Sequence, residues 1–144
     1  CLAVSDLEYP AGQLTAAAKI ALDKAITDEF KALSVYQAVI AKLGSNRPFS
    51  MIKGAEEQHI SQLKAIYDKY DLTLPSSAVV VKIDAPATLQ QACQIGVDAE
   101  IANAALYKNE LLPAVIQYPE ITTSFTNLMN ASINKHLVAF DRCN

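Results

Sequence analysis

Four segments of this chain repeat apolar side chains every three or four residues, the spacing of one face of an α-helix. A glutamate, a histidine or both interrupt each of these apolar faces, although burial of an unpaired charge is costly. Only four of the 144 residues are glycine, whereas alanine and leucine are abundant. The pattern therefore favours an all-α fold of long, packed helices over a turn-rich β architecture.

The first two helices are expected over residues 14–43 and 48–70. Gly44 suits the left-handed turn that ends many helices, and Pro48 suits the first turn of the second helix, where a missing N–H costs nothing. The predicted inward residues of the first helix are Leu22, Ala25, Glu29, Leu33, Tyr36, Ile40 and Leu43. Those of the second helix are Ile52, Glu56, His59, Leu63, Ile66 and Tyr70.

The third helix is expected to begin after Thr88, which has capping-box spacing to Gln91, and to end or kink at Pro113. Pro119 and Glu120 are suited to the start of the fourth. The predicted inward residues of the third helix are Leu89, Cys93, Gly96, Glu100, Asn103, Tyr107 and Leu111. Those of the fourth are Phe125, Met129, Ile133, His136, Phe140 and Cys143.

The length of the chain suits a single domain over residues 1–144, with residues 1–13 as an N-terminal arm. Residues 71–86 are too long for a simple helical hairpin, and the Val79–Val81 run favours β or extended structure. Extended, this segment would cover roughly 50 Å, more than the length of a 20-residue helix. We therefore expect it to cross the whole bundle between the second and third helices.

Ionisable residues on the inward faces form two similar sets. Glu29 precedes Tyr36 by seven residues, and Glu100 precedes Tyr107 by seven. The second helix carries Glu56-x-x-His59, whereas the fourth carries Ile133-x-x-His136. Three glutamates and both histidines of the chain would converge near the bundle centre. Carboxylate and imidazole ligands suit Fe, Mn or Zn, so a metal would compensate the buried charges.

These residues resemble the ferritin-like di-iron carboxylate superfamily, which places Glu on two helices and Glu-x-x-His on the other two. The segments DEFKALSVYQ, AEEQHISQL, TLQQACQIGVDAEI and ASINKHLVAF look like an uncharacterised prokaryotic family of ferritin-like domains, often exported. No activity can be carried over from that family. The resemblance implies a ferritin-like four-helix bundle with a long crossover.

The resemblance also assigns roles to the metal ligands. Glu29 and Glu100 would be terminal ligands and Glu56 a bridging one, with His59 and His136 as imidazole ligands. The superfamily's second bridging carboxylate would fall at Ile133, which cannot bind metal. Three carboxylates supply three negative charges, whereas two divalent ions carry four positive charges. The site therefore permits one ion, or an asymmetric pair with an added anion. Fe is the expected metal, with Mn or Zn as alternatives.

The sequence leaves two functions open, and they belong to different classes of protein. The first is metal binding with redox chemistry towards dioxygen or peroxide. The second is a non-catalytic exported bundle that acts through a partner, with a structural metal or none. In that case the glutamates would be exposed or paired with the histidines and lysines. Tyr36 and Tyr107 would either orient ligands or only pack, and Asp28, Glu57 and Asp98 are expected to face solvent.

The remaining expectations concern the cysteines, the compartment and other partners. If the third and fourth helices are antiparallel, Cys93 and Cys143 lie at one level and could form a disulfide; the alternative is two buried thiols. A disulfide would favour an exported protein, periplasmic or extracellular, and Cys1 resembles a bacterial lipoprotein's lipidated residue. No segment predicts a membrane span, and no basic run predicts nucleic-acid binding. The sequence does not define the oligomeric state.

Overall fold

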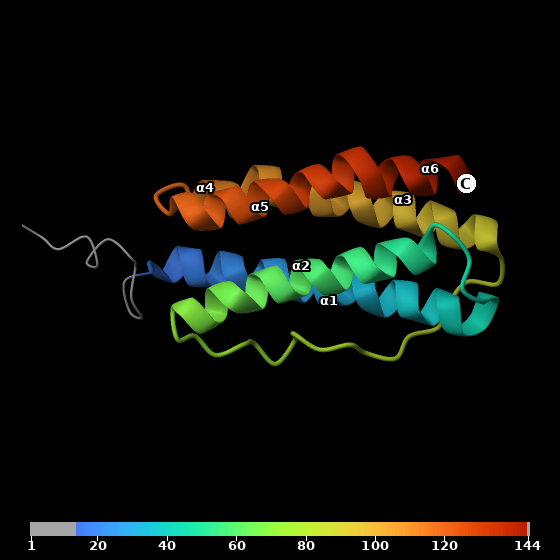
Figure 1. Cartoon of the computed structure of the whole chain (residues 1–144), viewed down its shortest axis with the longest axis horizontal. Coiled ribbons are helices and arrows are strands. Elements are labelled where there is room, and N and C mark those ends of the chain that lie inside the picture. The colour runs from blue at the N-terminus through green and yellow to red at the C-terminus, as the bar shows by residue number, and fades with distance from the viewer. Residues whose placement is uncertain (1–13, 144) are drawn as a thin grey trace, which may run out of the picture.

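The computed structural model describes residues 14–143 and shows an all-α four-helix bundle (Figure 1). The first two long helices are α1 (Ala16–Leu43) and α2 (Phe49–Lys69). The third consists of α3 (Leu89–Leu106), a π-helical turn η2 (Tyr107–Leu111) and the short α4 (Leu112–Ala114); the fourth consists of α5 (Pro119–Ala131), a π-helical turn η3 (Ser132–His136) and α6 (Leu137–Cys143). The predicted helices are confirmed, whereas the predicted arm at residues 1–13 lies outside the described residues.

Local signals in the sequence explain where the helices begin and end. The Thr15 hydroxyl accepts a hydrogen bond from Ala18 N at the start of α1, and Gly44 ends that helix with φ of 92°. At the start of α3, Thr88 and Gln91 form the predicted capping box. These caps satisfy backbone groups that a helix terminus otherwise leaves without partners.

The crossover after α2 determines the direction of α3 relative to α2. Figure 1 shows it running the length of the bundle along the outside of α1 and α2, so that α3 starts at the same end as α2. α1 and α2 are therefore antiparallel, whereas α2 and α3 are parallel. The crossover is irregular, with no strand in any part of the chain that the structure describes. Val81 N donates to Ser34 Oγ and Lys42 Nζ donates to Ala85 O, which fixes it against α1.

Two apolar clusters fill the bundle on either side of a polar layer. Tyr36, Phe49 and Phe140 are packed rings in the cluster nearer the start of α3. Tyr107 and Phe125 pack edge to face in the other cluster. Along the second, third and fourth helices, the inward glutamate or histidine falls between residues of the two clusters, and Glu29 of α1 lies close to their boundary. The ionisable side chains therefore form a layer in the middle of the core.

Cys93 and Cys143 lie at disulfide distance, with Cα atoms 5.8 Å apart, which agrees with the predicted pairing of the third and fourth helices. The pair belongs to the Tyr36–Phe140 cluster, on one side of the polar layer. A cross-link between positions 50 residues apart restricts the unfolded chain and so favours the folded state.

Gly96 lets α3 approach α6 closely. A Cβ at this position would lie 2.5 Å from Phe140 Cγ, and the buried ring has neighbours on its other sides. We expect Gly96→Ala to lower the free energy of unfolding by about 1–3 kcal/mol, as overpacking of a core does. Gly54→Ala is the matched control, because nothing lies within 4 Å of its Cβ position. This change should raise stability by about 0.5–1 kcal/mol.

Urea unfolding of both variants measures the difference. Equal effects of the two changes would contradict the close approach of α3 and α6.

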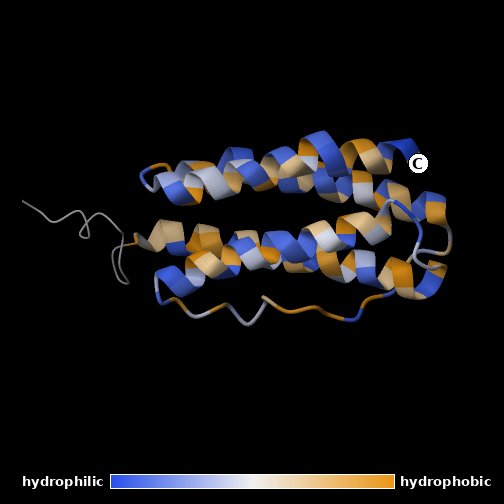
Figure 2. Cartoon of the chain, viewed as in Figure 1, coloured by the Kyte–Doolittle hydropathy of each residue, from blue (hydrophilic) through white to orange (hydrophobic). Residues whose placement is uncertain are grey.

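The hydrophobic half of the crossover remains on the surface. Figure 2 shows this apolar stretch, and Val79, Val81 and Ile83 are 50%, 50% and 37% exposed. The first inward residue predicted for the third helix, Leu89, is also exposed, because it lies at the end of the bundle. Within residues 14–143, no helix has the length and apolar character needed to span a membrane.

Candidate metal centre

The five predicted ligands come together in the polar layer of the core. Glu29 comes from α1, Glu56 and His59 from α2, Glu100 from α3 and His136 from η3. All five side chains are buried, and none is more than 8% exposed. Each helix therefore contributes at least one ligand-type side chain to one site.

The five side chains form two overlapping groups that share Glu56. In the first group, His59 Nδ1 lies 3.7 Å from Glu29 Oε2 and 3.6 Å from Glu56 Oε2. In the second, His136 Nδ1 lies 3.2 Å from Glu56 Oε1 and 3.1 Å from Glu100 Oε1. The candidate ligand atoms within each group all lie within 4.8 Å of one another. Each oxygen of Glu56 thus faces a different group.

Two buried polar atoms of the first group lack hydrogen-bond partners among residues 14–143. They are Glu56 Oε2 and His59 Nδ1, which face each other at a distance too long for a hydrogen bond. An unsatisfied buried polar group is costly, so most such groups in proteins have a protein, water or ion partner. Both atoms are metal-ligand types. Their placement fits a cation better than it fits a closed hydrogen-bond network.

The two tyrosines bind the terminal carboxylates crosswise. Tyr36 donates to Glu100 Oε1 at 2.9 Å, and Tyr107 donates to Glu29 Oε1 at 2.8 Å. Each tyrosine thus contacts the glutamate of the opposite helix rather than the one seven residues before it. Both hydroxyls are fully buried, and they fix the orientation of the carboxylates from outside the ligand set.

The π-helical turn η3 changes which residue faces the site from the fourth helix. Leu137 N donates to Ser132 O, an i→i+5 hydrogen bond that widens the turn before His136. Ser132 is consequently buried, whereas Ile133 is 41% exposed. The prediction that Ile133 faces the inside of the bundle is therefore wrong. Ser132 faces inward instead.

A polar chain next to Glu29 was not predicted from the sequence. Ser132 Oγ donates to Asn103 Oδ1 at 2.6 Å, and Asn103 Nδ2 donates to Asp28 Oδ2 at 2.6 Å. Asn103 Nδ2 also lies 3.5 Å from Glu29 Oε1. Asp28 is half-buried, and burial raises its pKa, so the expectation that it simply faces solvent is wrong. The spacing of residues along α1 could not reveal its hydrogen bond to Asn103, because Asp28 lies beside the inward face.

The other two flanking acids behave as expected. Glu57 is exposed and pairs with Lys53 at 3.0 Å, one helical turn away. Asp98 is exposed and accepts a hydrogen bond from Gln94. Neither of them contacts the five ligands.

Burial and crowding of like charges change the acidities within the site. Burial, followed by the charge of Glu56, raises the pKa of Glu29 to about 8. Burial opposes ionisation of Glu56 as well, but contacts with Glu29 and the two histidines lower its pKa overall. Burial also disfavours the charged histidines. However, the carboxylates around them dominate and raise the pKa of His59 to about 10 and that of His136 to about 9.

Without a metal, protons therefore balance the charge of the buried carboxylates. Two protonated histidines offset two of the three negative charges, and a proton on Glu29 offsets the third. A divalent cation would compete with these protons for the carboxylates and would offset two of the three negative charges.

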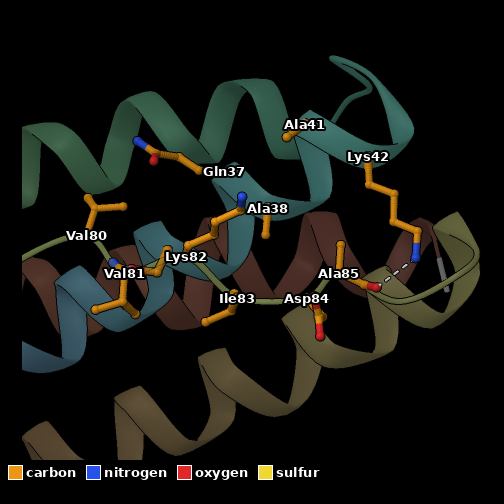
Figure 3. A pocket seen from close by; sticks show the side chains of 11 residues that line it. Gln37, Ala38, Ala41, Lys42, Val80, Val81, Lys82, Ile83, Asp84 and Ala85 are labelled. Carbon is orange, nitrogen blue, oxygen red and sulfur yellow. Dashed lines mark hydrogen bonds between the residues drawn. The ribbon is translucent and has the colours of Figure 1, made fainter.

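A more open cavity lies away from the buried site, between α1 and the crossover. Its volume is about 820 Å³, and Figure 3 shows it between Ala38 and Ala41 of α1 and the Val80–Ala85 stretch. None of the five candidate ligands lines this cavity, and its walls are those of an open surface groove. It therefore contributes nothing to the chemistry of the buried site.

The fold and the site together define an all-α four-helix bundle with a buried carboxylate and histidine cluster that could hold metal. Comparison of the chain with models of known protein families, with curated proteins and with solved structures found no match.

Proposed function

We propose that this protein is a ferritin-like metal protein that binds one or two divalent transition-metal ions between its four helices. The observation that supports this most strongly is the sharing of Glu56 between two ligand groups, together with the unpartnered Glu56 Oε2 and His59 Nδ1. A purely structural network would satisfy these buried atoms. The rival function, a non-catalytic bundle without a metal, leaves them without a hydrogen bond, with only an ion-pair contact of 3.6 Å between them.

The charge of the site limits the number of ions. Glu29, Glu56 and Glu100 supply three negative charges, and Ser132, which faces inward from the fourth helix, supplies none. Two divalent ions would leave one positive charge in a buried site, so a full pair needs an added anion such as hydroxide. A single ion in either group leaves one negative charge. The three carboxylates are therefore compatible with one ion, or with two ions and an added anion.

The donor atoms are compatible with iron. Each group offers two carboxylates and one imidazole, a mixed oxygen and nitrogen set that suits Fe, Mn or Zn rather than Cu(I). Two carboxylates with one histidine leave coordination positions open in each group. Bound iron or manganese would supply redox chemistry with dioxygen or peroxide at those positions. The chain's own residues would hold the ligands in place, with Tyr36 and Tyr107 fixing the terminal carboxylates.

Titration of metal-free protein with Co(II) tests the binding. We expect visible absorption bands to grow and to saturate at one or two equivalents, because protein nitrogen and oxygen ligands replace water. Absence of saturable bands, together with unchanged thermal stability after chelation of the purified protein, would contradict the proposal.

Oxygen consumption by Fe(II)-loaded protein in air tests the redox chemistry separately. Oxidation faster than in buffer alone is the expected result. An oxidation rate equal to that in buffer would leave the proposal of metal binding standing but would favour the non-catalytic bundle.

We further propose that the protein works in an oxidising compartment outside the cytoplasm. The Cys93–Cys143 pair at disulfide distance supports this, because such cross-links persist mainly in exported proteins. The expected lipidated residue, Cys1, lies outside the described residues. Non-reducing mass spectrometry of protein purified from its native host would detect both modifications.

A further inference from the structure

A second, smaller cavity lies against the metal centre. It is a cleft of about 390 Å³ between the start of α2 and the η3–α6 part of the fourth helix, within the size range of ligand pockets. We call it the arginine cleft. Its lining residues are Arg47, Pro48, Met51, Ile52, Ala55, Lys135, His136, Ala139, Arg142 and Cys143. Because His136 is both a lining residue and a candidate ligand, the inner wall of the cleft is the edge of the metal centre.

The arginine cleft collects positive charge in an acidic protein. The chain has a net charge of -3, yet its only two arginines, Arg47 and Arg142, both line this cleft, and Lys135 is the third cation. No aspartate or glutamate lines it. Within residues 14–143, none of the three cations lies within 4.0 Å of a carboxylate. By contrast, Lys53 of α2, which does not line the cleft, pairs with Glu57.

The rest of the wall is apolar. Met51, Ile52, Ala55 and Ala139 contribute aliphatic surface, and Met51 is 57% exposed. Guanidinium groups bind carboxylates and phosphates through paired hydrogen bonds, and apolar walls bind hydrocarbon. The lining therefore matches a molecule with an acidic group at one end and an apolar chain at the other.

We propose that the arginine cleft binds a small organic acid with an apolar body, held by Arg47, Arg142 and Lys135 against the metal ligand His136. The acidic group of this molecule occupies the mouth of the cleft, where the exposed cations lie. Its apolar body lies over Ile52 and Ala139. This inference names the substrate class for the proposed metal centre, and in that respect it rests on the proposed function. The binding itself needs no metal.

Octanoate is the probe, titrated into metal-free and Zn-loaded protein by calorimetry. We expect octanoate to bind both forms, and octanamide and acetate to bind at least tenfold more weakly, because each lacks one half of the recognised molecule. Arg142→Gln should weaken octanoate binding by about tenfold, since an exposed guanidinium partner is lost. Lys82→Gln removes the same charge from an exposed crossover position outside the cleft and should leave the affinity unchanged.

Equal affinities for octanoate and octanamide, or equal losses in Arg142→Gln and Lys82→Gln, would overturn the inference. Co(II)-loaded protein gives a second readout, because octanoate held beside His136 should shift the visible bands. Unchanged bands at saturating octanoate would place the acid away from the metal and overturn its role as substrate.

The two proposals fail separately. Octanoate binding that depends on Arg142, in a protein that takes up no metal, would support the cleft and overturn the metal centre. Stoichiometric metal with no octanoate binding would support the metal centre and overturn the proposal for the cleft.

Discussion

Replacement of Glu56 by glutamine should remove most of the metal affinity of this protein. Glu56 is the only residue shared by the two ligand groups, and glutamine keeps the shape of the side chain without its charge. We expect a loss greater than the roughly 10–100-fold that removal of an outer hydrogen-bond partner causes at metal sites. Competition with a chromophoric chelator measures the affinity, and circular dichroism verifies that the helices remain.

Glu57→Gln is the matched control for this experiment. It makes the same chemical change one residue further along α2, but on the exposed face, where Glu57 pairs only with Lys53. Its metal affinity should equal that of the unchanged protein. Similar losses in the two variants, or full metal binding by Glu56→Gln, would show that the buried cluster is not the binding site.

The stability of the metal-free protein should fall as pH rises from 8 to 10. The pKa values of Glu29, His59 and His136 are raised in the folded protein to about 8, 10 and 9, from ordinary values of 4.5 and 6.5. The folded state therefore binds these protons more tightly than the unfolded chain. Their stabilising effect is complete below the ordinary values and is lost as pH rises through the raised ones. A decrease in Tm of at least about 5 °C is expected over this interval.

Metal affinity should change in the opposite direction. The same protons must leave before a cation can bind, so the apparent affinity should rise with pH by up to about tenfold per displaced proton and pH unit. Thermal melts of metal-free and Zn-loaded protein at pH 7–10 measure both trends in one series. The difference in Tm between the two forms should widen with pH. A constant difference would show that the histidines and Glu29 release no protons on binding.

The fold was predictable because helical periodicity is a local property. Thr88, Gly44 and Pro119 mark helix ends through backbone chemistry that depends on a few adjacent residues. The inward positions of the five candidate ligands were predictable for the same reason, since a glutamate or histidine within an apolar stripe faces inward.

The details that depend on packing between helices were not predictable in this way. The crosswise pairing of Tyr36 with Glu100 depends on the register of two antiparallel helices, which spacing within one helix cannot reveal. Ile133 was misplaced because an i→i+5 turn leaves no mark in the pattern of apolar residues. The arginine cleft brings Arg47 together with Arg142, which lies far from it in the sequence.

The central claim is that a metal ion lies between Glu56 and the histidines, and anomalous diffraction from a Zn-loaded crystal tests it most directly. Data collected on both sides of the zinc absorption edge would locate the ion. We predict an anomalous peak about 2.0–2.2 Å from a Glu56 oxygen and from a ring nitrogen of His59 or His136. Zinc found only at surface carboxylates, with no peak in the buried layer, would contradict the account.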